Sequence, residues 1–194
     1  MPRRYVNVPR RKDLLLCAGH VPLVCPSHAA ETAQDADPLQ QAQRIAWQKL
    51  EALEDASVRA LGPHAAQLPQ LAADTLVVLG ERVLGKPQDA QEARQMLQAL
   101  SGTTHRVITG VVVRQGLRHR AFAVSTTVSF RPLTADEVGR YVASGEPFDK
   151  AGGYGIQGEG AALVHQVHGS FTNVIGLPLA ETLAALDALA RPSP

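Results

Sequence analysis

Hydrophobic residues recur along this chain at two spacings, and the helical spacing predicts helices in several places. The longest lies over 38–61, where Asp-Pro supplies an N-cap and a first-turn proline ahead of an amphipathic repeat. An aspartate caps the segment 90–100, and a capping box opens 134–143. Near the ends of the chain, 9–18 predicts a helix that a glycine terminates, and 178–189 predicts one that packs into the fold, because it is apolar on most faces.

Runs of apolar and β-branched residues predict the strands. One of these runs is interrupted by a single Asp-Thr pair and is long enough for a central strand, followed by a tight hairpin. The predicted strands are 21–25 (buried), 71–79, 82–85, 104–115, 118–133 and 161–169, with loops over 26–37, 62–69 and the glycine-rich 145–160. The interleaved order predicts an α/β or α+β sheet in a single domain over 1–194, not a purely parallel wound sheet.

Composition and charge exclude several classes of protein. The 194 residues are 45% hydrophobic and 19% charged, an ordinary balance for a domain with its own core. Lysine plus arginine number 19 and aspartate plus glutamate 18, which does not favour a nonspecific nucleic-acid binder, although the N-terminus is locally basic. Neither a signal peptide nor an apolar run of about 18 residues is present, so a cytoplasmic protein with no membrane partner is expected. Cys17 and Cys25 are interpreted as reduced core residues.

Three motifs resemble ligand sites but lack the context that such sites need. Gly153-x-Gly155-x-x-Gly158 matches a dinucleotide fingerprint, yet a loop precedes it and a strand follows it. The segment from Gly80 to Lys86 nearly matches a phosphate loop but lacks the Ser/Thr that ligates magnesium. His165 and His168 would point to opposite faces of a strand, which does not favour a shared metal.

Two acidic residues lie at positions where packing of the fold does not require a charged side chain. Asp74 interrupts the apolar run 71–79, and a carboxylate inside a central strand is costly unless it is paired or metal-bound. A strand edge or a bulge is the alternative explanation for Asp74. Glu31 lies in a loop of small residues and could supply a second carboxylate.

Cationic groups are spread over the other segments. Arg10 and Arg11 open a helix, where an anion site and a solvated basic end are both possible. Lys49 lies on the long predicted helix and Lys86 follows the hairpin, while Gln157 lies in the glycine-rich loop, where backbone can approach a ligand closely. Cations can hold a polyphosphate, carboxylates can hold Mg²⁺ and orient a water, and an amide can read the edge of a base.

At this point the residues resemble a known family, the Maf nucleoside triphosphate pyrophosphatases. The similarity covers nearly the whole chain in order, and the combination of short motifs is more specific than any one of them. The matching stretches are Pro9-Arg10-Arg11-x-x-Leu14-Leu15, Glu31-Thr32, Arg44-x-Ala46-x-x-Lys49, Ala73-Asp74-Thr75, Leu84-Gly85-Lys86-Pro87, Leu100-Ser101-Gly102-x-Thr104-His105, Thr109-Gly110, residues 141–158, Gly169-Ser170 and Asn173-Val174-x-Gly176-Leu177-Pro178.

The resemblance implies a fold, a reaction and partners. The fold would be a two-lobed α/β structure around a long twisted mixed sheet, similar to inosine triphosphate pyrophosphatases and commonly a homodimer. The reaction would be metal-assisted hydrolysis of a nucleoside triphosphate to the monophosphate and pyrophosphate, with Mg or Mn, as nucleotide-pool cleansing. The substrate would be the partner, with no nucleic acid involved.

The resemblance also implies roles for single residues. Asp74 would be the catalytic proton acceptor, and Glu31 and Asp74 would hold the metal. The specificity positions Arg10, Thr75 and Gln157 resemble the branch that acts on dTTP and UTP. The expected substrate-binding residues are Arg10, Arg11, Glu31, Lys49, Thr75, Lys86 and Gln157.

The N-terminus departs from the family pattern, which leaves an alternative function open. Val6 and Val8 stand where the family usually has serines, and Ala30 stands where an acidic residue is usual before Glu31. Each lost hydrogen bond to a charged phosphate would weaken binding by about 1.5–3 kcal/mol. A nucleotide-binding regulatory protein with weakened catalysis is therefore one alternative, and a nucleic-acid-binding module that uses the basic N-terminus is another.

Overall fold

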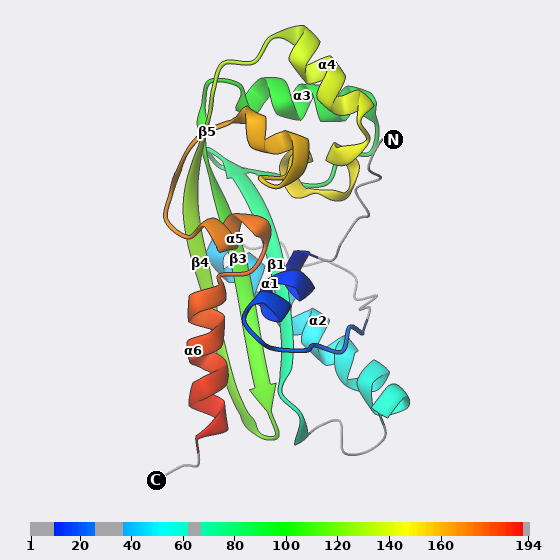
Figure 1. Cartoon of the computed structure of the whole chain (residues 1–194), viewed down its shortest axis with the longest axis vertical. Helices are drawn as coiled ribbons and strands as arrows, with labels where there is room; N and C mark the ends of the chain where they lie inside the picture. Colours follow the sequence, from blue (N-terminus) through cyan, green and yellow to red (C-terminus); the bar gives the residue numbers. More distant parts are fainter. Residues whose placement is uncertain (1–9, 26–36, 62–66, 192–194) are drawn as a thin grey trace.

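The fold is built on a long, twisted sheet (Figure 1). The computed structural model describes residues 10–25, 37–61 and 67–191. Its five-stranded sheet has the order β2-β1-β3-β4-β5, and all pairings among the described strands are antiparallel, without the parallel component of the expected mixed sheet. The strands are β1 Gln70–Leu79, β2 Arg82–Leu84, β3 Thr104–Gln115, β4 Arg118–Phe130 and β5 Val164–His168. The predicted hairpins are confirmed.

The helices cover both faces of the sheet and one of its ends (Figure 1). They are α1 Arg10–Cys17, α2 Pro38–Leu61, α3 Ala90–Leu100, α4 Ala135–Ala143, α5 Phe171–Ile175 and α6 Leu179–Ala190, with 3-10 turns η2 Glu146–Asp149, η3 Ala151–Gly153 and η4 Gly158–Leu163. The predicted caps are confirmed, since the Asp89 carboxylate accepts from the Glu92 amide at 2.8 Å and Thr134 and Glu137 form a capping box. Among the described residues, no helix combines the length and apolarity needed to cross a bilayer.

The hydrophobic core is divided between the two ends of the sheet, in agreement with the two-lobed α/β architecture. The largest cluster of buried residues joins α3 and α4 to the ends of β3 and β4. Three smaller clusters lie along the remainder of β1 and β3, one of them under α6 and the other two under α2. The glycine-rich segment 145–160 lies in the upper part of Figure 1 with α3 and α4, whereas α1, α2 and α6 lie below it.

Helix α2 lies against the sheet at Gly110 of β3. A Cβ added to Gly110 would stand 2.3 Å from the carbonyl carbon of Ala42, so only glycine allows this approach. Ala42, Ala46 and Leu50 are fully buried in this contact, and burying a leucine side chain stabilises a fold by about 1.5–3 kcal/mol. The approach matters for the site because Gly110 is the register partner of Asp74.

Several expectations from the sequence are wrong in detail. Residues 21–25 form no strand and expose Val21 at 89%, because an apolar run becomes a strand only where it meets a sheet edge, and this one pairs with none of the described strands. Both cysteines are free, as predicted, but Cys17 is exposed and is not a core residue. Strand β4 ends three residues before the predicted limit. The first residues of the strand predicted over 161–169 belong to the 3-10 turn η4 instead. Helix α5 was not predicted.

Candidate active site

The buried carboxylate of Asp74 is held by a lysine from α2. Asp74 lies in the middle of β1 and is 6% exposed, and the Lys49 Nζ stands 2.6 Å from its Oδ1. The close approach of α2 at Gly110 carries Lys49, two turns beyond Ala42, to the same face of the sheet. The positive charge offsets the cost of burying the carboxylate. Asp74 is therefore in a charged setting and does not point into packed hydrocarbon.

Thr75 faces the other side of the sheet, because neighbouring residues of a strand point to opposite faces. Its Oγ1 accepts from the Arg11 Nη2 at 3.2 Å and lies 2.9 Å from the Oγ1 of Thr109. Arg11 also donates through Nε to the Gly176 carbonyl at 2.7 Å, which joins α1 to the end of α5. The site residues predicted on β1 are thus divided between the two faces of one strand.

The edge of β1 that faces away from β3 gives a ligand access to both faces of the sheet. Strand β2 pairs only with Val77, Val78 and Leu79, so no described strand covers that edge at Asp74 and Thr75. Consecutive Cα atoms are only about 3.8 Å apart, and a ligand lying along this edge can therefore reach side chains on both faces.

Arg10 connects α1 to the glycine-rich segment. Its Nη2 donates to the Asp149 carboxylate at 3.2 Å, and the other oxygen of Asp149 lies 2.6 Å from the Lys150 Nζ. The Arg10 side chain is 29% exposed, so it remains accessible to a ligand. The contact thus joins the N-terminal helix to a segment 139 positions further along the chain.

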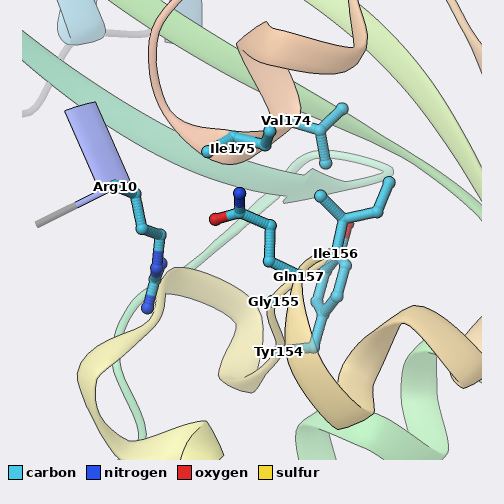
Figure 2. A pocket seen from close by; sticks show the side chains of 7 residues that line it. All are labelled: Arg10, Tyr154, Gly155, Ile156, Gln157, Val174 and Ile175. Carbon is cyan, nitrogen blue, oxygen red and sulfur yellow. The ribbon is translucent and has the colours of Figure 1, made fainter. Parts of the chain in front are cut away.

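A small pocket lies between this segment and α5 (Figure 2). In Figure 2 the Gln157 amide lies between Arg10 and Ile175, so the polar groups gather on one side. Apolar side chains, among them Ile156 and Val174, form the other side. The lining residues are Arg10, Tyr154, Gly155, Ile156, Gln157, Val174 and Ile175. Such a cleft suits a flat ring with polar atoms on its edge.

Tyr154 lines the pocket and contacts a histidine of β3. Its hydroxyl lies 2.6 Å from the Nε2 of His105, and both rings pack edge-to-face with Phe130. Burial raises the pKa of Tyr154 and lowers the pKa of His105 to about 4, so both side chains are neutral near pH 7.

Lys86 is exposed and lies next to the glycine-rich segment. The carbonyl of the preceding residue, Gly85, accepts from the Gly152 amide at 2.9 Å. A Cβ on Gly152 would meet the Val77 side chain at 2.8 Å, and Val77 lies about 10 Å along β1 from Asp74. The backbone of this segment is thus joined to β1 beside the candidate site.

The candidate site offers a metal ion the carboxylate of Asp74. Within residues 10–25, 37–61 and 67–191 there is no cluster of three or more His, Cys, Asp or Glu side chains that could hold a metal. Mg²⁺ is commonly held by one or two carboxylates together with substrate phosphates and waters, and the Asp74 carboxylate fits that kind of site. Glu31, the second ligand expected from the sequence, lies outside the described residues, as do Val6, Val8 and Ala30.

Sequence reasoning did not find three of the contacts that shape this site. They are the pairing of Asp149 with Arg10, the contact of Tyr154 with His105, and the hydrogen bonds of the Glu146 carboxylate. The dense glycines around these residues were the available signal, because glycine marks close approach of backbone to other atoms. What approaches the backbone could not be deduced from the spacing.

Comparisons with known proteins agree with this picture. The profile of the family described as "Maf-like protein" matches residues 7–189. The chain is 45% identical over 192 residues to a dTTP/UTP pyrophosphatase of Anaeromyxobacter sp. (strain Fw109-5), covering 96% of this chain and 88% of the relative. It is 42% identical over 180 residues to a dTTP/UTP pyrophosphatase of Bacillus pumilus (strain SAFR-032), covering 92% and 91%. A protein of the same name from Syntrophus aciditrophicus (strain SB) is 43% identical, covering 92% and 84%.

Proposed function

The chain belongs to the Maf-like protein family, and on that premise we propose that it is a pyrophosphatase that hydrolyses dTTP and UTP. The observation that carries the proposal is the Asp74–Lys49 pair at an open strand edge, next to the segment that bears Gln157. The products are the nucleoside monophosphate and pyrophosphate, and the cellular role is cleansing of the nucleotide pool.

The pocket beside Gln157 binds the base. Uracil and thymine present an N–H donor between two carbonyl acceptors, and an amide side chain offers one acceptor and one donor to such an edge. The guanidinium of Arg10 contains only donors, so it pairs with a carbonyl oxygen and not with an amino group. Ile156 and Val174 contact the faces of the ring.

Four cationic residues bind the triphosphate. Arg11 lies on the Thr75 side of β1, Lys49 on the Asp74 side, and Arg10 and Lys86 next to the glycine-rich segment. Charge-assisted hydrogen bonds to phosphate oxygens are stronger than neutral ones and offset charge on the leaving pyrophosphate. Glu31 is a further ligand, either to the substrate or to the metal.

Asp74 acts as the proton acceptor. A water oxygen attacks the α-phosphorus, the bond from that phosphorus to the oxygen bridging to the β-phosphate breaks, and the proton of the water passes to the Asp74 carboxylate. Lys49 fixes the orientation of the carboxylate through its contact with Oδ1. A divalent cation, Mg²⁺ or Mn²⁺, held by Asp74 and Glu31, would supply charge neutralisation of the phosphates.

The test is a panel of nucleoside triphosphates with Mg²⁺ and with Mn²⁺, scoring pyrophosphate against orthophosphate. Asp74→Asn should lower turnover of dTTP by at least about a hundredfold, because the amide cannot accept the proton. Asp136→Asn, at an exposed carboxylate in the first turn of α4, is the matched control and should keep the parent rate. A parent chain that binds dTTP tightly without releasing pyrophosphate would instead favour the nucleotide-binding regulatory function.

Three further properties belong to the same proposal, the first from the family resemblance and the other two from the sequence. The protein is a homodimer, it is cytoplasmic, and its 194 residues form a single domain. Light scattering after size exclusion measures the first property, cell fractionation the second, and a single cooperative unfolding transition the third. A monomer at micromolar concentration, a membrane-associated fraction, or two separate transitions would each contradict the corresponding statement.

A further inference from the structure

The segment that carries Gln157 is a closed arch. Gly155 and Gly160 meet at its base, where a Cβ added to Gly160 would lie 2.2 Å from the Gly155 carbonyl oxygen. Gln157 stands on the outer part of this arch and is exposed. The two ends of the arch are therefore in backbone contact, and anything that fixes them also fixes the residue between them.

A single carboxylate, that of Glu146, holds both ends. Its Oε2 accepts from the Glu159 amide at 3.0 Å, and its Oε1 accepts from the Gly160 amide at 3.3 Å. Oε1 also lies 3.0 Å from the Tyr141 hydroxyl, and that hydroxyl oxygen accepts from the Gly155 amide at 3.1 Å. Glu146 thus binds one end of the arch directly and the other through Tyr141.

The site is built for a carboxylate. Two backbone amides and one hydroxyl point at it, and an ionised carboxylate accepts all three without offering a competing donor. Burial, together with the adjacent Glu146, raises the pKa of Tyr141, so its hydroxyl keeps the proton that it donates. A Cβ on Gly158 would lie 2.7 Å from Oε2, so the arch closes tightly around the carboxylate.

The direction of the Gln157 side chain depends on this backbone. Within the part of the chain that the structure describes, the Gln157 amide has no hydrogen-bond partner, so only its own backbone and the packing of the pocket set its direction. We propose that Glu146 is a positioning residue for base recognition: it fixes the arch 155–160 so that Gln157 meets the Watson–Crick edge of the pyrimidine. This inference rests on the proposed pyrophosphatase function.

The experiment compares Glu146→Gln with a matched carboxylate elsewhere. The glutamine keeps the shape but turns an NH₂ group toward donors, so it cannot hold both ends of the arch. Glu137→Gln is the control, because the Glu137 carboxylate accepts from the Thr134 amide at 2.8 Å and pairs with Arg131 at 2.9 Å but does not line the pocket. Each variant is assayed for kcat and KM with UTP and CTP, which differ only at the base edge, and for hydrogen exchange of the amides of residues 155–160.

In Glu146→Gln, exchange over 155–160 should accelerate and the UTP:CTP ratio of kcat/KM should fall by about fivefold or more, mainly through KM for UTP. In Glu137→Gln the ratio should stay at the parent value. Unchanged exchange in Glu146→Gln would overturn the clamp, and faster exchange with an unchanged ratio would reduce Glu146 to a structural residue.

Two provisions keep the test decisive. If Glu146→Gln does not fold, Tyr141→Phe keeps the carboxylate and removes only the bridge to Gly155, and a smaller shift in the same direction is expected. If the parent releases no pyrophosphate from any nucleotide, the proposed function fails. The UTP:CTP ratio of dissociation constants, measured by calorimetry, then replaces the kinetic ratio, and an unchanged ratio in Glu146→Gln overturns the inference.

Discussion

Stability should depend on pH through the buried histidine behind the pocket. His105 is 2% exposed, and burial lowers its pKa from 6.5 to about 4. A group whose pKa is lower in the folded state favours folding above its unfolded pKa, and this contribution is lost as the pH falls through 6.5 toward 4. The shift corresponds to about 3 kcal/mol in total, of which about 2 kcal/mol is lost by pH 5.

The assay is urea unfolding of the parent and of His105→Gln at pH 7.5 and pH 5. Glutamine can still form a hydrogen bond with the Tyr154 hydroxyl but does not titrate, so the variant should lose about 2 kcal/mol less than the parent over this interval. Carboxylates elsewhere contribute equally to both proteins and cancel in the difference. Equal losses in the two proteins would refute the assignment of this pH dependence to His105.

The remaining predictions concern α2 and the pocket. Lys49→Met leaves the Asp74 carboxylate without this cation, so the free energy of unfolding should fall by about 3 kcal/mol and turnover should be lost. A stability equal to that of the parent in a denaturant titration would contradict the pairing. Gly110→Ala forces α2 away from the sheet, because the backbone of Ala42 lies 2.3 Å from the position of the new methyl group. The free energy of unfolding should fall by about 1–3 kcal/mol, seen as a lower urea midpoint. An unchanged midpoint would contradict the close approach of α2 to Gly110. Gln157→Glu removes the amide donor at the base edge and should shift preference away from the pyrimidine substrates dTTP and UTP; unchanged rates for dTTP and UTP relative to a purine nucleotide in a competition assay would argue against base reading by this residue.

The arrangement explains how a chain with balanced charge can bind a highly charged substrate. Only four of the 19 lysines and arginines, Arg10, Arg11, Lys49 and Lys86, are proposed to bind the triphosphate, and they lie around one strand edge and the glycine-rich segment. Some acids are inside the site itself, where Asp149 pairs with both Arg10 and Lys150. A triphosphate must therefore compete with, or extend, ion pairs that already exist.

Much of the local structure could be predicted from the sequence. The boundaries of α2 and α3 follow from a cap followed by a helical repeat, and the β3–β4 hairpin follows from two β-branched segments around Gln115-Gly116. Asp74 was singled out because it breaks an apolar strand, a signal that needs no knowledge of its neighbours. The whole-chain set of motifs was sufficient to indicate the family.

Other features could not be predicted from spacing. The run 21–25 has the composition of a buried strand but meets no described sheet edge, so its apolar side chains are exposed. The predicted site residues are confirmed as neighbours only in pairs, such as Lys49 with Asp74 and Arg11 with Thr75, and their catalytic roles stay predictions.

The sequence by itself determined the elements, the acidic residue in the central strand and the family, because capping, periodicity and turn chemistry act over a few residues. Only the tertiary structure decided that the side chains of Asp74 and Thr75 lie on opposite faces of the sheet, beside the uncovered edge of β1. The same holds for the arch 155–160, whose backbone amides bind the Glu146 carboxylate. The physical reason is that these arrangements depend on contacts between distant segments. Arg10 and Asp149 are 139 positions apart, and packing of the sheet and its helices brings them together.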